Sequence, residues 1–242
     1  MIYWIRQNRQ IGIARNKTMN IQSIDNLGID RVLKRGSGEI VLKRNDALLV
    51  RDTVSGAYLF ACDDTENALA LLDRYIGGDC ELLMISDYAL GIAAYERYGF
   101  SEKLECYQVA YYGEKPSTDT ALSIRAANEN DLPTLIKNYH MISAEELERV
   151  VTRGSVLLGY DGDRLVGFIG EHLEGSMGLL YVFPEYRRRG FGAALQKNLI
   201  AKTMEEGFIP FGQVEKDNAG SLKLQEKLGM TISNDLIVWM WK

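Results

Sequence analysis

The sequence predicts an α/β (α+β) protein whose two halves repeat one arrangement of strands and helices. Strand and helix patterns alternate clearly through the second half of the 242 residues. A polar segment with Gly and Pro, residues 113–120, separates this half from the first. The motif Tyr-Glu-Arg-Tyr-Gly-Phe at 95–100 matches Gln-Glu-Lys-Leu-Gly-Met at 225–230. We therefore expect a domain at 1–112, a linker at 113–121 and a second domain at 122–242.

The second half predicts the order β-α-α-β-β-β-α-β-α-β. Helices are expected from Asp131, with Pro133 in the first turn, and from Ser143, which forms a capping box with Glu146. A third helix begins at about Gly190, and a fourth spans 221–228. Strands are expected at 122–125, 156–160, 165–169, 179–183, 211–214 and 236–241.

The first half gives a weaker version of the same pattern. Strands are expected at 40–43, 47–50, 58–61, 81–85 and 106–112, and helices at 67–75 and 90–98. The similarity of the two motifs that end in Gly and an apolar residue predicts an internal repeat of one fold, although it is loose enough to arise by coincidence.

Composition excludes several classes of protein. The net charge of -5 argues against general nucleic-acid binding. Three widely spaced cysteines and two histidines provide no metal-binding pattern, so no metal is expected, and a reducing, cytoplasmic location is favoured. The sequence has no apolar run of the roughly 20 residues that a membrane span needs. Residues 1–17 contain four basic residues and no acid, which imitates a transit peptide but also fits an amphipathic docking segment.

The strongest chemical signal is the run Leu-Tyr-Val-Phe-Pro-Glu-Tyr-Arg-Arg-Arg-Gly-Phe-Gly at 180–192. It predicts a strand, a tight basic loop and a helix. The free N–H groups and the macrodipole of a helix N-terminus favour an anion. Gly190 and Gly192 allow close backbone approach, and three arginines add positive charge. An Arg triplet alone is more often a surface turn, but its position between strand and helix predicts a phosphate site.

These residues resemble the GNAT acetyltransferase superfamily. Arg-Arg-Arg-Gly-Phe-Gly at 187–192 is similar to its Arg/Gln-x-x-Gly-x-Gly/Ala loop, and Asn-Ala-Gly-Ser at 218–221 is similar to its second motif. The resemblance covers 122–242 well and the first half faintly. It implies two tandem domains of mixed, mostly antiparallel sheet flanked by helices, the first degenerate. The wording of both motifs resembles the tandem branch that includes glycine N-acyltransferases.

The resemblance also implies a cofactor and the residues that bind it. Acetyl-CoA, or another acyl-CoA, would be the co-substrate, with its pantetheine arm on the strand at 180–182 and its pyrophosphate on the basic loop. One strand N–H, that of Val182 or a neighbour, would polarise the thioester carbonyl. Asn218 would bind pantetheine or phosphate, or would only cap a helix. The implied binding residues are Leu180, Tyr181, Val182, Arg187, Arg188, Arg189, Gly190, Phe191, Gly192, Ala193, Asn218 and Ser221.

One position departs from the superfamily pattern. Many members have a Tyr four residues before the Gly of the second motif, where it protonates the departing thiolate. Gln225 stands at this position. An amide is too weak an acid for that role, so Tyr181, water or unassisted departure of the thiolate remain open.

The expected general base lies in the hairpin that leads into the cofactor strand. We rank His172 first, because an imidazole titrates near neutral pH, then Glu174 and then Glu171. Strand alternation places Glu171 and His172 on opposite faces. Water, or a group supplied by the first half, is the alternative route for the proton.

The first half is expected not to bind CoA. Its counterpart of the basic loop reads Ala-Cys-Asp-Asp-Thr-Glu at 61–66, with acids where a pyrophosphate would lie, and Tyr88 aligns with Asn218. This half would pack on the second as a pseudo-dimer in a monomer, or the chain would form a homodimer. The expected activity is acyl transfer to a primary amine of a small molecule or amino acid; the alternative is a non-catalytic acyl-CoA sensor or scaffold.

Overall fold

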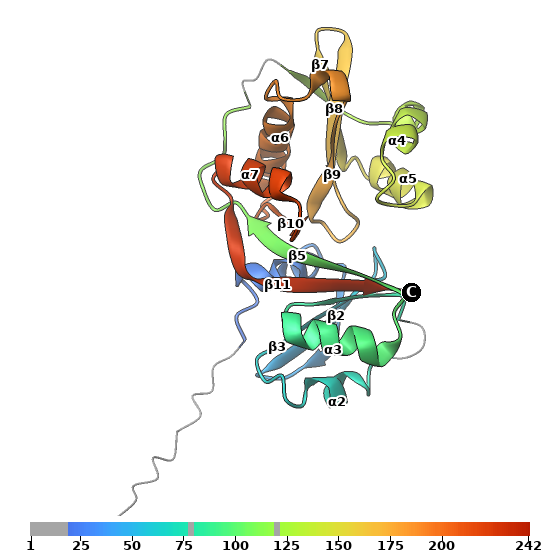
Figure 1. Cartoon of the computed structure of the whole chain (residues 1–242), viewed down its shortest axis with the longest axis vertical. Coiled ribbons are helices and arrows are strands. Elements are labelled where there is room, and N and C mark those ends of the chain that lie inside the picture. The colour runs from blue at the N-terminus through green and yellow to red at the C-terminus, as the bar shows by residue number, and fades with distance from the viewer. Residues whose placement is uncertain (1–18, 77–79, 119–121) are drawn as a thin grey trace, which may run out of the picture.

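The computed structural model describes residues 19–76, 80–118 and 122–242. The basic segment 1–17 and the end of the expected linker, 119–121, lie outside the described residues. The described residues form one mixed sheet in the order β1-β2-β3-β4-β11-β5-β10-β9-β8-β7-β6, with helices on both faces (Figure 1). The predicted α/β class is therefore confirmed. No helix among the described residues combines the length and apolar character that crossing a membrane requires.

The second half contains the predicted elements in the predicted order. Its strands are β6 (Ser123–Ala126), β7 (Val156–Asp161), β8 (Arg164–Glu171), β9 (Met177–Val182), β10 (Phe211–Glu215) and β11 (Thr231–Trp241). Its helices are α4 (Leu132–Asn138), α5 (Ala144–Thr152), α6 (Phe191–Glu205) and α7 (Ala219–Lys227). Helix α7 begins two residues earlier than predicted because the side chain of Asn218 accepts a hydrogen bond from the N–H of Ser221 and caps it.

The first half contains strands β1 (Gly38–Lys43), β2 (Ala47–Asp52), β3 (Tyr58–Cys62), β4 (Leu82–Ile85) and β5 (Glu102–Ala110). Its helices are α1 (Leu27–Lys34), α2 (Ala68–Leu72) and α3 (Tyr88–Tyr98), preceded by a 3-10 turn, η1 (Ile24–Asn26). Sequence patterns did not predict α1. The helix has only eight residues, and two of its buried residues, Asp30 and Arg31, are charged, which sequence patterns assign to the surface.

The last strand of each half lies between strands of the other half. β11 pairs antiparallel with β4, and β5 pairs antiparallel with β10. β5 and β11 also pair with each other along most of their length, from Glu102 opposite Trp241 to Ala110 opposite Thr231. In Figure 1 these two strands cross the boundary between the halves. Each half of the sheet is therefore completed by the other half of the chain.

Helices cover both faces of the sheet in the second half, and the ends of β9 and β10 lie between these helices. Leu195 and Leu199 of α6 pack against one face, in a cluster that contains Val166. Leu135 of α4 and Leu147 of α5 pack in the cluster on the other face. Strand alternation supplies apolar side chains to both clusters, as expected for a sheet that is buried on both sides.

Candidate active site

The parallel strands β9 and β10 separate almost as soon as they meet. Their only register partners among the described residues are Met177 and Gly212. A Cβ atom at Gly212 would lie 2.5 Å from the carbonyl oxygen of Met177, so the close approach requires glycine there. Beyond this point the two strands leave an opening in the middle of the sheet.

A bulge in β9 lies at this opening. Gly170 of β8 is opposite Gly178, but Phe168 is opposite Tyr181, so β9 contains one extra residue. Leu179, within the bulge, has a φ of 52°, an uncommon conformation for a residue with a side chain. A bulge interrupts the ladder and leaves backbone groups unpaired with the neighbouring strand. Backbone N–H groups near Leu180 are therefore available as hydrogen-bond donors beside the cleft.

The cleft between the separated strands is a cavity of about 70 Å³. Strand residues line two sides of it, and the α6 and α7 helices contribute polar side chains. Val109, from β5 of the first half, also reaches it. The lining residues are Val109, Ile169, Met177, Gly178, Leu180, Gln196, Gly212, Gln213, Val214, Ser221 and Gln225.

The predicted basic loop connects β9 to α6. Gly190, with a φ of 86°, is the N-cap residue, and α6 then continues for 15 residues. Arg187 donates from Nε to the carbonyl oxygen of Val182 at 3.0 Å. Arg189 lies 3.4 Å from Asp161 and over the ring of Phe191. Arg188, exposed and with a φ of 60°, has no ion pair among the described residues. Its guanidinium is accessible to an anion near the first turn of α6.

The remaining predicted cofactor residues differ in their position relative to this opening. Leu180 and Ser221 line the cavity, and Gly192 lies in the first turn of α6 near the side chains of Val182 and Leu180. Tyr181 faces away from this cavity, since its ring stacks on Phe168 at 5.4 Å. Asn218 is exposed, and its Oδ1 is engaged in capping α7, which leaves its Nδ2 as the group for a ligand. Ala193 is the third residue of α6 and half-buried.

Gln225 lies inside the cavity wall, paired with a glutamine of α6. Gln196 Nε2 donates to Gln225 Oε1 at 2.5 Å, and Gln225 Nε2 donates to Gln196 Oε1 at 3.3 Å. Both side chains are buried. Sequence reasoning identified Gln225 but not its partner, because nothing in the sequence relates positions 29 residues apart on different helices. The pair satisfies two polar groups that the cleft would otherwise leave without partners.

His172 does not line this cavity, but it lies against Gly178, which does. Its Nδ1 is 3.7 Å from Oε1 of Glu146 on α5. A Cβ at Gly178 would be 2.4 Å from His172 Nε2, so the ring edge covers the backbone of Gly178, which lines the cavity. The imidazole therefore has one nitrogen towards a carboxylate and the other against the backbone of β9.

Acidic neighbours change the protonation of His172. Burial alone lowers the pKa of this imidazole, but the Glu146 carboxylate and the charge of Glu174 outweigh that effect and raise the pKa above its ordinary value of 6.5. Glu174 is buried and accepts a hydrogen bond from the hydroxyl of Ser176. Glu146 was predicted to close a capping box. Ser143 does accept from its N–H, at 3.0 Å, but the Glu146 carboxylate contacts His172.

Glu171, the third candidate base, is engaged elsewhere. Its Oε2 lies 2.7 Å from Arg31 of α1, and its Oε1 accepts from Thr203 of α6 at 2.8 Å. The Arg31 and Glu171 side chains are 5% and 8% exposed, so this is a buried ion pair between the two halves. Arg31 also stacks over Phe208, 4.0 Å from the ring centroid. Both oxygens of the Glu171 carboxylate are thus engaged, so a structural role fits this residue better than proton transfer does.

Tyr139 is a further polar side chain that sequence reasoning missed. Burial raises the pKa of its phenol, while a hydrogen bond from the backbone of Leu179 lowers it. That contact supports the bulge residue of β9. Tyr139 follows α4 in an irregular segment with no motif, so only the folded structure identifies it.

No group of three or more His, Cys, Asp or Glu side chains within the described ranges is arranged to hold a metal ion.

The first half differs from the second at α3, the helix that matches α7. Asp87, rather than the aligned Tyr88, is the N-cap residue of α3 and accepts from Leu90 N at 2.8 Å. Helix α3 begins one residue earlier than the alignment implies.

The comparisons with known proteins agree with this geometry. Residues 123–230 match the model of the acetyltransferase (GNAT) family. No significant match was found among curated proteins. A Drosophila protein has the same fold with a TM-score of 0.63 at 15% identity, covering 93% of this chain and 91% of that one. A GNAT-family protein from Novosphingobium aromaticivorans gives 0.55 at 18%, covering 89% and 96%.

A GCN5-related N-acetyltransferase-like protein from Streptococcus suis gives a TM-score of 0.55 at 15% identity, covering 89% of this chain and 92% of that chain. At these identities the structural matches show the fold alone, and they extend over both halves. The family-model match covers the cleft residues other than Val109, the basic loop and the α7 motif. Residues 123–230 are therefore similar to the acetyltransferase (GNAT) family, whose members use acetyl-CoA as co-substrate.

Proposed function

We propose that this protein transfers an acetyl or short acyl group from acyl-CoA to a primary amine of a small molecule or amino acid. The observation that carries the proposal is the position of His172, whose Nε2 lies against the backbone of the cleft residue Gly178. The basic loop lies at the other end of β9. Strand β9 thus has the proposed anion site, at the N-terminus of α6, near one end and the proposed proton acceptor, His172, near the other.

The residues of the loop fit the pyrophosphate of acyl-CoA. A 15-residue helix directs its free N–H groups towards the loop, and Gly190 has open space around it and a φ of 86°. We assign the anion to these N–H groups and to Arg188, and the pantetheine arm to the separated edge of β9. Bound acyl-CoA supplies an activated acyl carbonyl and a thiolate leaving group.

The residues of the chain then have separate roles. His172 accepts a proton at Nε2 from the acceptor's ammonium, so that the free amine attacks the carbonyl carbon as the carbon–sulfur bond breaks. A backbone N–H of the β9 bulge, at Leu180 or Val182, stabilises charge that develops on the carbonyl oxygen, a contribution of about 3 kcal/mol in comparable sites. Gln225 has no acidic proton, so the sulfur departs as the thiolate, and the second proton of the attacking nitrogen passes to water or to this thiolate as the amide forms.

The charges around His172 favour a cationic acceptor. Glu146 and Glu174 both lie close enough to raise the pKa of His172, and no Lys or Arg among the described residues forms an ion pair with either carboxylate. Negative charge on this side attracts an ammonium group. The motif resemblance to glycine N-acyltransferase-like proteins makes glycine and other amino acids the first acceptors to test.

The organisation of the chain follows from the same proposal. The first half would act as a non-catalytic partner in a pseudo-dimer, or in a homodimer of the whole chain, and Val109 would be its contribution to the cleft. A reducing compartment such as the cytoplasm suits Cys62, Cys80 and Cys106, none of which forms a disulfide within the described residues.

An assay of free thiol release over an amine panel tests the proposal. His172→Gln is expected to lower kcat at least ~100-fold, while acetyl-CoA affinity, measured by calorimetry, is unchanged. Glu174→Gln serves as a comparison on the same hairpin. Calorimetry is also expected to give one CoA per chain. Acetyl-CoA binding without thiol release for any amine would instead favour a sensor, and wild-type turnover in His172→Gln would assign the proton to water.

A further inference from the structure

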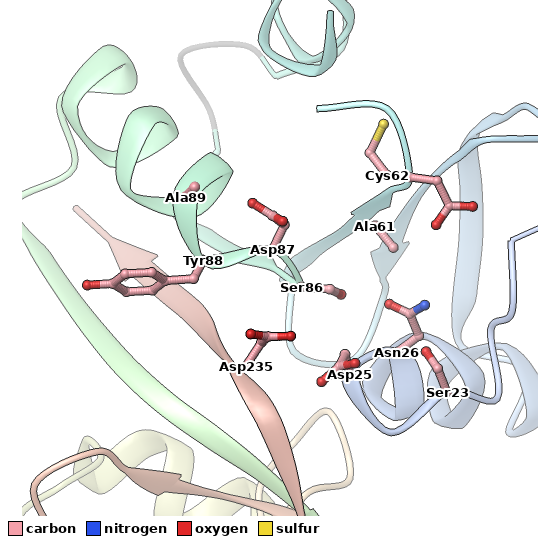
Figure 2. A pocket seen from close by; sticks show the side chains of 11 residues that line it. Ser23, Asp25, Asn26, Ala61, Cys62, Ser86, Asp87, Tyr88, Ala89 and Asp235 are labelled. Carbon is pink, nitrogen blue, oxygen red and sulfur yellow. The ribbon is translucent and has the colours of Figure 1, made fainter. Parts of the chain in front are cut away.

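A second hollow lies in the first half, at the carboxyl ends of the parallel strands β3 and β4. These strands are the counterparts of β9 and β10 in the sheet order. The hollow has a volume of about 440 Å³, within the size range of small-molecule sites. The η1 turn, the end of β3, the start of α3 and Asp235 of β11 surround it, as Figure 2 shows.

The lining of this hollow is acidic. Asp25, Asp63, Asp87 and Asp235 come from four separate segments, and no Lys, Arg or His is among the described residues that line it. In the part of the chain that the structure describes, none of the four forms an ion pair with a basic side chain. Burial raises the pKa of Asp25, and the charge of Asp235 raises it further. The hollow thus concentrates negative charge without a protein cation to balance it.

Asn26 provides an independent indication of a ligand. It is 8% exposed, its Nδ2 donates to the carbonyl of Asn20 at 3.0 Å, and its Oδ1 is buried with no hydrogen-bond partner. Figure 2 shows this side chain directed into the space between Ala61 and Ser86. Oδ1 of Asp25 is also buried without a partner. A buried acceptor without a donor costs about 1–3 kcal/mol, so both atoms require a donor that the described residues do not supply.

The required ligand is a cation with several N–H donors. A single metal ion does not fit, because no three carboxylates among the described residues converge closely enough to ligate one. Carboxylates on separate sides of a hollow of this volume suit a molecule with more than one positive charge. We propose that this hollow is a binding site for an aliphatic polyamine, with its ammonium groups on Asp25 and Asp235 and an N–H on Oδ1 of Asn26.

A chain of hydrogen bonds connects this site to the catalytic cleft. Gln108 of β5 is fully buried, and its Nε2 donates to the carbonyl of Ile24, next to Asp25, at 2.7 Å. Its Oε1 accepts from Nε2 of Gln213 at 2.9 Å, and Gln213 lines the cavity between β9 and β10. Two hydrogen bonds thus connect Ile24 of η1 with Gln213 in the cleft, and a polyamine that fixes η1 acts on this connection.

Calorimetric titration of the full chain with spermidine, without acyl-CoA, tests the proposal. We expect one site per chain, weakened by salt, and a loss of at least tenfold in affinity in the double variant Asp25→Asn, Asp235→Asn. Asp163→Asn with Glu226→Gln removes the same charge from exposed positions and should bind as the wild type does. Circular dichroism establishes that each variant is folded.

Three results would overturn the proposal. Spermidine binding that survives in the Asp25 and Asp235 double variant but disappears in His172→Gln would place spermidine in the acceptor site. Binding of Mg²⁺ or Ca²⁺, but not spermidine, at the aspartates would assign the hollow to a metal ion. The basic segment of the chain itself would be the occupant of the hollow if spermidine bound only after Arg6, Arg9, Arg15 and Lys17 were changed to Gln. Acetyl transfer is measured separately, so these outcomes do not depend on the proposed reaction.

Discussion

Replacing Gly178 by Ala should move His172 without disturbing the fold. The added Cβ would lie 2.4 Å from Nε2, whereas ordinary contact begins at 3.4 Å, so the ring must move about 1 Å. The backbone of Gly178 has no positive φ, so alanine adds no strain there. Among the described residues, only the contact with Glu146 and side-chain packing hold the imidazole in place. Its side-chain torsions can change at a cost of about 1 kcal/mol, which moves the ring away.

A displacement of this size is large for a catalytic base. A misplacement of 1 Å can reduce turnover about 100-fold, and we expect a loss of kcat of roughly 10- to 100-fold. Thiol release with a fixed acceptor measures it, and calorimetry with acetyl-CoA should show unchanged affinity. Gly28→Ala in α1 is the matched control, because its Cβ would meet only the end of Met84 at 3.7 Å. Wild-type kcat in a folded Gly178→Ala protein whose imidazole has moved would refute His172 as the base.

Three further changes test other parts of the site. Glu146→Gln removes the largest influence that raises the pKa of His172, so the rise of kcat with pH should move to lower pH. In the wild type, the stabilisation that the protonated imidazole provides is present below pH 6.5 and is lost as the pH rises through the raised pKa. Urea unfolding at a series of pH values measures this loss. An unmoved profile would argue against the pairing. Arg188→Glu should weaken acetyl-CoA binding more than tenfold by calorimetry with an unchanged melting temperature, and equal affinity would remove the arginine from the anion site. Glu171→Gln leaves Arg31 buried without its partner and should cost about 3 kcal/mol in urea unfolding; lost turnover at unchanged stability would instead make Glu171 catalytic.

The sequence predicted the local structure of the second half well because its signals are local. Pro184 ends a strand, Gly190 begins a helix in a conformation that favours glycine, and Ser143 caps α5, each through backbone chemistry within a few residues. The order of elements and the position of the basic loop follow from such signals. The same reasoning missed α1, whose buried side chains include an arginine that is neutralised only by Glu171, 140 residues away.

Tertiary structure decided everything that depends on pairs of distant residues. The exchange of β5 and β11 between the halves leaves no trace in either strand, because the residues of a strand do not specify which distant strand will pair with it. The approach of His172 to Glu146, the Gln196 and Gln225 pair, and the acidic hollow around Asn26 likewise join separate elements. The sequence alone determined that a basic loop follows a strand and that a helix begins after Gly190. Only the folded chain determined which side chains share the cleft with it, since their separation in space is set by sheet order and helix packing rather than by spacing along the chain.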